Sequence, residues 1–207
     1  MVRDFKLYVI VDRNAMGRRD LVYVAKEAIA GGADVIQLRD KDAAVKDLMK
    51  VGLTLRKLTY RSGVLFIVND RTDIAKAVDA DGVHLGQDDL PIKIARSILG
   101  KHKIIGLSTH SISQAEEAQK KGADYIGVGP IFATPTKPEY KAVGVDLIRR
   151  VKNKIKIPFV AIGGINESNL DKVLTAGASR IAVIRAVCGA EDIRRAARNL
   201  KERLLNR

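Results

Sequence analysis

The sequence has few of the features that would place the protein outside the cytoplasm or in a membrane. Its single cysteine, Cys188, cannot form an intramolecular disulfide. The N-terminal stretch lacks the apolar run followed by small residues that marks a secretory signal. Charged residues interrupt every hydrophobic run before it reaches the roughly 20 residues that a membrane-spanning helix needs. We therefore expect a cytoplasmic protein with no membrane association.

Aromatic residues are also scarce, although the chain is strongly basic. They make up 4% of the residues, tryptophan is absent, and the formal net charge is +13. A protein that binds single strands needs aromatic side chains on which bases stack, and we recognise no nucleic-acid motif. The excess cations fall in segments typical of solvated helix faces, at 149–156 and 194–203. We expect no nucleic-acid partner, and steeply salt-dependent binding of DNA or RNA would support the contrary interpretation.

Short apolar, β-branched runs alternate with longer amphipathic stretches along the whole chain. Such alternation predicts repeated strand–helix units and a parallel sheet. The predicted strands are 6–11, 34–38, 64–68, 82–85, 104–107, 125–128, 159–162 and 180–184. Eight parallel strands close a barrel, so we predict a single-domain (βα)8 TIM barrel over residues 1–207.

A weak internal repeat supports this prediction. It consists of Gly32-Ala33-Asp34, Gly122-Ala123-Asp124 and Gly177-Ala178-Ser179, each at the end of a predicted helix. Glycine can take the left-handed conformation that ends a helix. A doubly wound open sheet would also show the alternation, but no glycine-rich dinucleotide fingerprint follows the first strand. In a closed barrel the chemistry lies at the carboxyl ends of the strands.

The second strand ends in a basic segment. Alternation along an extended chain places Gln37, Arg39 and Lys41 on one face, toward the barrel mouth. Two cations are costly to desolvate without an anion, so a phosphate or diphosphate ligand is indicated. The alternative is a structural pairing of Arg39 with Asp40 or Asp42.

Acidic residues follow the next two strands. Asn69-Asp70 ends the third strand, and Asp88-Asp89 follows the fourth. Magnesium typically takes one or two protein carboxylates, with phosphate and water completing its shell. The pattern predicts a Mg²⁺ site, although Asp88 or Asp89 could instead cap the following helix.

The remaining strand ends carry hydroxyls and glycines. Ser108 follows the fifth strand and could donate to a phosphate or cap the next helix. The loop 129–137 is too long for a minimal connection, which is typical of functional loops. Gly163-Gly164 and the region of Arg185 follow the last two strands, where such barrels often hold phosphate, although a tight turn would use the same glycines.

The histidines and the cysteine indicate no covalent or metal chemistry. His84, His102 and His110 show no metal-ligand spacing and are interpreted as structural or exposed. Cys188 has no recognisable activating neighbour in the sequence, so we interpret it as a small buried residue.

Through the motifs at these strand ends, the sequence resembles the thiamine-phosphate synthase family along nearly the whole chain. The matching motifs are, in order, QLRDK, VND, GVHLGQDD, GLS, GPIFATPTK and AIGGI. The resemblance implies a magnesium-dependent transferase that joins an aminopyrimidine methyl diphosphate to a thiazole phosphate. The products would be thiamine phosphate and pyrophosphate.

The resemblance also implies roles for individual residues. The pyrimidine diphosphate would be held by Gln37, Leu38, Arg39, Asp40, Lys41, Asn69, Ser108 and Lys137, of which Arg39, Lys41, Ser108 and Lys137 would act in catalysis. The thiazole phosphate would be held by Thr134, Pro135, Thr136, Gly164, Ile184 and Arg185, and Mg²⁺ by Asp70 and Asp89. Arg185 departs from the family, whose members often carry serine there. A backbone amide contact would survive that change.

The implied reaction agrees with the residue types. The thiazole nitrogen attacks without carrying a proton, so no general base is needed, and preorganised charge must stabilise the departing diphosphate. A thiazole tautomerase, which joins no rings, is the second enzyme hypothesis. Retention of QLRDK, Asn69-Asp70 and Asp89 favours the synthase, and a phosphosugar isomerase is more distant. We expect small-molecule substrates, and a homo-oligomer is compatible with the sequence.

Overall fold

Eight parallel strands close into a barrel in the part of the chain that the computed structural model describes, residues 5–136 and 140–206. The strands are β1 Leu7–Asp12, β2 Val35–Arg39, β3 Leu65–Asn69, β4 Gly82–Leu85, β5 Ile104–Thr109, β6 Tyr125–Val128, β7 Phe159–Ile162 and β8 Ile181–Val183. Their spatial order follows their order in the chain, and β8 returns to pair with β1 through Leu7 and Ile181. The predicted (βα)8 barrel is confirmed, and the open sheet is excluded.

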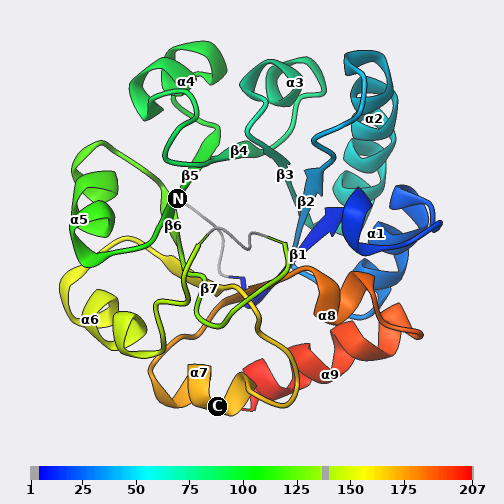
Figure 1. The fold of residues 1–207 in the computed structure, drawn as a ribbon. Helices are drawn as coiled ribbons and strands as arrows, with labels where there is room; N and C mark the ends of the chain where they lie inside the picture. The colour runs from blue at the N-terminus through cyan, green and yellow to red at the C-terminus, as the bar shows by residue number, and fades with distance from the viewer. Residues whose placement is uncertain (1–4, 137–139, 207) are drawn as a thin grey trace.

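Helices surround the barrel, as Figure 1 shows along its axis. They are η1 Arg13–Ala15, α1 Leu21–Ala30, α2 Val45–Ser62, α3 Thr72–Ala77, α4 Ile92–Leu99, α5 Ile112–Lys120, α6 Asp146–Lys154, α7 Leu170–Thr175, α8 Arg185–Cys188 and α9 Ile193–Leu205. Each longer helix buries one apolar face against the sheet, as α9 does with Ile193, Ala197 and Leu200. No described helix is long and apolar enough to cross a bilayer.

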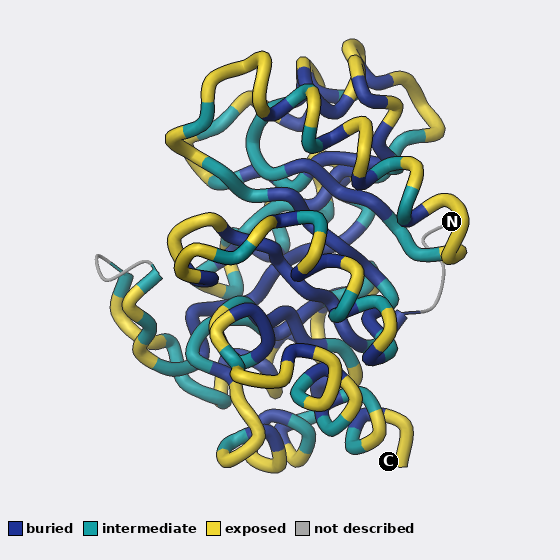
Figure 2. Tube along the Cα trace, turned by 90° about the vertical axis from the view of Figure 1, so that its right-hand side faces the viewer, coloured by how far each residue is buried: buried dark blue, intermediate teal, exposed yellow. Residues whose placement is uncertain are grey.

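Two hydrophobic cores follow from this arrangement. The larger lies between the strands and the helices, and the smaller fills the barrel interior. Figure 2 shows the buried residues in the centre and the exposed ones on the outer turns of the helices. In the interior, the Phe5 ring packs edge-on against Tyr8 and Tyr125 at centroid distances of 6.0 and 6.3 Å. The aromatic residues are few, but these three gather where they fill the barrel.

The internal repeat recurs at every second unit. The second residue after the end of α1, α3, α5 and α7 has a positive φ: Gly32 at 99°, Asp79 at 54°, Gly122 at 84° and Gly177 at 105°. The sequence pattern predicted three of these positions and missed Asp79, because aspartate occupies the place of the glycine. Aspartate tolerates the left-handed region better than most residues.

Three of these units carry an aspartate that ties its strand to the preceding one. We call these residues the basal aspartates. Each accepts a hydrogen bond from a backbone N–H of the preceding strand and pairs with a cation from a helix. The three sets are Asp34 with Leu7 and Lys201, Asp81 with Phe66 and Arg56, and Asp124 with Ile105 and Arg96. The backbone contacts measure 2.9, 2.8 and 2.7 Å in the same order.

Candidate active site

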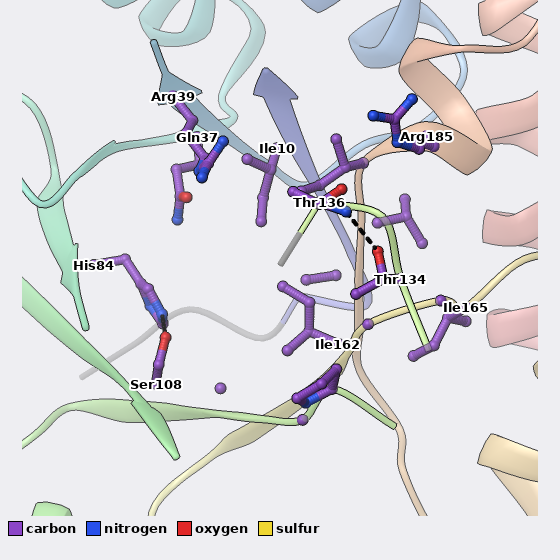
Figure 3. A pocket seen from close by; sticks show the side chains of 18 of the residues that line it. Ile10, Gln37, Arg39, His84, Ser108, Thr134, Thr136, Ile162, Ile165 and Arg185 are labelled. Atoms are coloured by element: carbon purple, nitrogen blue, oxygen red, sulfur yellow. Dashed lines mark hydrogen bonds between the residues drawn. The ribbon is translucent and has the colours of Figure 1, made fainter. Parts of the chain in front are cut away.

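A cavity of about 330 Å³ opens at the carboxyl ends of the strands. Most of the site residues predicted from the sequence line this cavity, namely Gln37, Arg39, Asn69, Asp70, Ser108, Thr134, Pro135, Thr136, Gly164, Ile184 and Arg185. Gln37, Arg39, His84 and Ser108 lie on one side, and Thr134, Thr136 and Arg185 lie on the other (Figure 3). The floor between them is apolar and includes Ile10 and Ile162.

Four of the predicted site residues that the structure describes do not line the cavity. Leu38 is buried in the core outside the sheet, because its side chain alternates with those of Gln37 and Arg39. Asp40 accepts a hydrogen bond from Arg13 Nε at 3.3 Å, and Lys41 and Asp89 lie beside Asp70 at the rim. Any contact of Leu38 with a ligand in the cavity would therefore come from its backbone. Lys137 lies outside the described residues.

Arg39 is already paired with a carboxylate, but not the one that the sequence suggested. Its guanidinium donates to Asp12, which ends β1 directly beside Arg39 in the strand register. The Asp12 side chain is 2% exposed and that of Arg39 is 11% exposed. The alternative, in which Arg39 pairs with Asp40 or Asp42, is therefore wrong, because the carboxylate that pairs with Arg39 is Asp12. Asp12 holds the guanidinium in place and offsets part of its charge.

Two carboxylates meet at the rim above β3 and β4. The Asp89 side chain accepts a hydrogen bond from the Gly86 amide at 2.6 Å, and Asp70 has a φ of 58°. Burial raises the pKa of Asp70 to about 6, and a hydrogen bond and charge repulsion from Asp89 add to this effect. Lys41 lies 3.5 Å from Asp70 and opposes the rise in its pKa. Burial and the neighbouring carboxylate therefore outweigh the charge of Lys41 in setting the pKa of Asp70.

This pair fits a divalent cation that takes further ligands from a phosphate. The described residues contain no group of three His, Cys, Asp or Glu side chains that could hold an ion by themselves. Magnesium commonly uses only one or two protein carboxylates and completes its shell with phosphate and water. A side chain at position 86 would come within 2.9 Å of an Asp89 oxygen, so Gly86 leaves room for this carboxylate.

Neither alternative helix-capping role is observed. Pro91 begins α4 without a side-chain cap, and Ser111 caps α5 by accepting from the Gln114 amide. Asp89 instead accepts from the Gly86 amide within its own turn. Ser108 points into the barrel interior, where it contacts His84.

Two histidines on the cavity wall were not predicted as site residues. His84 bonds to Ser108 Oγ at 3.0 Å and to Tyr125 OH at 2.9 Å. Its position could have been found, because it alternates with the buried apolar residues Val83 and Leu85 and must therefore face inward. His110 stacks on Tyr140 at 4.4 Å and contacts the Gly129 carbonyl oxygen. His102 is exposed, as expected.

The long loop after β6 packs onto the turn after β7. The Phe132 amide donates to the Gly163 carbonyl at 3.0 Å. Gly164 has a φ of 64°, and a side chain there would meet Phe132 Cβ at 2.7 Å. Both glycines are therefore needed for the close approach. The approach brings Thr134 and Thr136 to the cavity, and the Thr136 amide donates to Thr134 Oγ1 (Figure 3).

Cys188 is buried at the end of α8, and its thiol donates to the Ile10 carbonyl at 3.2 Å. Burial raises the pKa of this thiol to about 12. The interpretation of Cys188 as a small buried residue is confirmed, and the raised pKa disfavours the thiolate, which is the reactive form.

Comparison with known proteins agrees with this geometry. The model of the family described as "Thiamine monophosphate synthase" matches residues 7–187. A thiamine-phosphate synthase of Chloroflexus aurantiacus is 50% identical over 199 residues, covering 96% of this chain and 92% of that protein. One from Syntrophomonas wolfei is 47% identical over 200 residues and covers 96% of both.

A solved structure shows the same architecture. The thiamine phosphate pyrophosphorylase from Pyrococcus furiosus superposes with a TM-score of 0.90 at 46% identity, covering 98% of this chain and 96% of that one. The family model spans most of the chain, and the relatives match it over nearly their whole length. The protein therefore belongs to the thiamine-phosphate synthase family.

Proposed function

We propose that this cavity joins an aminopyrimidine methyl diphosphate to a thiazole phosphate, forming thiamine phosphate and releasing pyrophosphate. One observation carries the proposal: two sets of polar groups face each other across one cavity with an apolar floor (Figure 3). A planar ring from each substrate fits above that floor, and the charged ends extend to opposite sides. The family relationship supports the same reaction.

The pyrimidine diphosphate is assigned to the side that holds Arg39 and Ser108. Arg39 is kept in place by Asp12, so little conformational entropy is lost when it meets a phosphate. Lys41 lies beside Asp70 and can reach the same anion. Gln37 and Asn69 supply amide groups on this wall. Lys137, from the loop after β6, is proposed for the same anion by resemblance alone.

Asp70 and Asp89 are assigned to the magnesium ion. When bound there, the ion would neutralise charge that develops on the leaving diphosphate. The proposed fit rests on the proximity of the two carboxylates. Burial, and then the neighbouring Asp89, raise the pKa of Asp70, and a cation bound there would favour its charged form.

The thiazole phosphate is assigned to the opposite side. Thr134 and Thr136 offer hydroxyls, and Gly164 lets the backbone approach a phosphate closely. Arg185 begins α8 on this side and adds a positive charge where serine is common in the family (Figure 3). We expect Arg185 to contribute charge to the thiazole phosphate in addition to any backbone contact.

The reaction needs no proton transfer. The thiazole nitrogen forms a bond to the pyrimidine methylene carbon, and the bond from that carbon to the diphosphate oxygen breaks. The diphosphate leaves with the electron pair. The protein therefore has to position the two rings and stabilise the leaving anion, a task for Arg39, Lys41 and Ser108.

Pyrophosphate release tests this proposal. The purified protein is incubated with both substrates, with each alone, and with and without Mg²⁺. We expect release only with both substrates and the metal, together with thiamine phosphate. A thiazole tautomerase would form no joined product, and this outcome would overturn the proposal; the names of the relatives favour the synthase.

Location and assembly remain part of the proposal. The single buried cysteine supports a cytoplasmic protein without disulfides. The absence of nucleic-acid partners stays a prediction, and a homo-oligomer stays compatible with the sequence.

A further inference from the structure

A continuous chain of hydrogen bonds crosses the barrel interior beneath the cavity. We call it the interior chain; its links are Gln37 Nε2 to Tyr8 OH at 2.6 Å, Tyr8 OH to Tyr125 OH at 3.0 Å, Tyr125 OH to His84 Nδ1 at 2.9 Å, and His84 Nε2 to Ser108 Oγ at 3.0 Å. The five residues come from five different strands. Both of its ends, Gln37 and Ser108, line the cavity.

A glycine makes room for the centre of this chain. Gly106 lies on β5 between His84 on β4 and Tyr125 on β6 in the strand register. A side chain there would come within 2.2 Å of Tyr125 Cζ and 2.6 Å of His84 Nδ1. The contact between the imidazole and the phenol therefore requires glycine at position 106.

The direction of the chain follows from counting protons. Tyr8 and Tyr125 are fully buried, and burial raises the pKa of both phenols, so each carries one proton. The Gln37 amide donates to Tyr8, so Tyr8 donates to Tyr125, and Tyr125 donates to His84 Nδ1. With the Gln37 amide nitrogen toward Tyr8, as this hydrogen bond has it, the Tyr8 proton would have no acceptor among the described residues if the direction were reversed. A buried donor left without an acceptor is costly, so the first direction is favoured.

We propose that His84 is a positioning residue, held as the neutral imidazole with its proton on Nε2, and that it donates this proton to Ser108 Oγ. Ser108 Oγ then accepts a hydrogen bond from His84, so the Ser108 hydroxyl must donate its own proton to a different acceptor. Because Ser108 lines the cavity, that proton is available to a ligand oxygen. The interior chain thereby makes Ser108 a donor selective for an acceptor such as an anionic phosphate oxygen. Only the identity of this acceptor, the diphosphate, rests on the proposed function.

Nitrogen NMR of the ligand-free protein tests the tautomer without any substrate. The three histidines are labelled with ¹⁵N, and His84→Asn identifies the His84 signals by their loss. We expect an unprotonated Nδ1 and a protonated Nε2. A proton on Nδ1, or on both nitrogens, at pH 7.5 would overturn the proposal. In Tyr125→Phe, Nδ1 loses its donor, so we expect the preference for this tautomer to weaken; an unchanged preference would also count against the proposal.

Kinetics test the positioning role through two amide replacements. The amide of His84→Gln can reach the position of Nε2 and donate to Ser108, whereas the shorter amide of His84→Asn reaches only toward Tyr125. We expect His84→Asn to lower kcat by roughly 10- to 100-fold, as loss of an orienting partner commonly does. His84→Gln should recover most of that loss, with the KM for the thiazole phosphate unchanged in both. Equal losses in the two variants would overturn the positioning role.

The two proposals fail separately. If the wild-type protein forms no joined product, the proposed function falls while the NMR result stands. If the product forms and the tautomer is the opposite one, only the positioning role of His84 falls.

Discussion

Asp70, which we assign to the proposed metal site, also affects stability. Its carboxyl group is buried beside Asp89, and its pKa in the metal-free protein is raised to about 6 from the 3.8 of an unperturbed aspartate. Because the folded pKa lies above the unfolded value, the metal-free protein loses stability from this group as the pH rises from about 4 through about 6. When Asp70 ionises, two negatively charged carboxylates lie side by side, and a bound cation would offset their repulsion.

The variant Asp70→Asn tests this conclusion. Asparagine also tolerates the left-handed backbone at position 70, so the fold should be kept. We expect the metal-free variant to melt at a higher temperature than the wild type at pH 7.5, with the difference vanishing below about pH 4. Mg²⁺ should raise the melting temperature of the wild type at pH 7.5, and much less at pH 5, but should leave the variant unchanged. An equal response of both proteins to Mg²⁺ would contradict the assignment of Asp70 to the metal.

Arg39 is the residue whose loss should affect turnover most clearly. We expect Arg39→Ala to lower kcat by roughly 100-fold or more, because one charge-stabilising contact to the leaving diphosphate is lost. Arg13→Ala is the matched control, since Arg13 is more exposed and pairs with Asp40 away from the cavity. Steady-state pyrophosphate release measures both. Near-normal turnover of Arg39→Ala would remove Arg39 from the mechanism.

The sequence predicted which residues line the cavity better than it predicted which residues they pair with. The rims of β2 and β3 were found from charge and amide groups at strand ends, and Gln37, Arg39, Asn69 and Asp70 all line the cavity. The partner of Arg39 was missed, because Asp12 lies 27 residues away in the chain and meets Arg39 only through the strand register. Such contacts depend on barrel closure, which local patterns do not describe.

At the scale of an element, α9 completes the helical ring by packing against α1. Its buried face includes Leu200, which is fully buried, whereas Leu205 at its end is 58% exposed. Gly31 at the end of α1 permits this contact, since a side chain there would lie 2.6 Å from Ala197 Cβ. Two leucines of one helix therefore offer a matched test of burial.

We expect Leu200→Ala to lower the free energy of unfolding by about 2–5 kcal/mol, since it removes buried methyl groups and leaves a cavity. Leu205→Ala should change it by less than about 0.5 kcal/mol. Urea denaturation followed by circular dichroism measures both values. Comparable losses in the two variants would show that α9 does not pack as described.

Strand boundaries followed from the sequence to within one or two residues. The strand 104–107 was predicted too short, because β5 continues to Thr109, whose hydroxyl donates to the Gly127 carbonyl and so stays in the sheet. Polar residues at the carboxyl end of a strand resemble a loop when read locally. That ambiguity is greatest where the site lies.

Across the whole molecule, the two ends of the barrel have different tasks. The basal aspartates join strands and helices at the amino ends of the strands, while the cavity lies at the carboxyl ends. Substitutions at the two ends should therefore separate stability from activity.

Asp124→Ala provides the test at the basal end. It removes the acceptor of the Ile105 amide and the partner of Arg96, so we expect a loss of about 1–3 kcal/mol in stability. The control is Asp146→Ala, whose exposed pair with Arg149 should contribute less than about 1 kcal/mol. Assayed well below its melting temperature, Asp124→Ala should keep the kcat of the wild type. A large loss of kcat would show that the two ends are coupled.

The net charge was the global property hardest to interpret from sequence. Many of the cations prove to be partners of carboxylates on neighbouring elements, as in Arg194 with Glu27 and Arg203 with Asp171. Composition counts these charges but does not show which of them are paired, since pairing is set by which helices become neighbours.

The basal aspartates also bear on how accurately the mouth is assembled. Each one links the first residues of a strand to its neighbour, so a strand displaced along its neighbour by one pleat would lose both its amide and its cation. The stagger of the strands is thus fixed at the amino ends, and a closed barrel transmits one stagger around its whole circumference. Side chains that belong to different strands, such as Arg39 and Asn69, consequently owe their alignment to anchors at the far end of the protein.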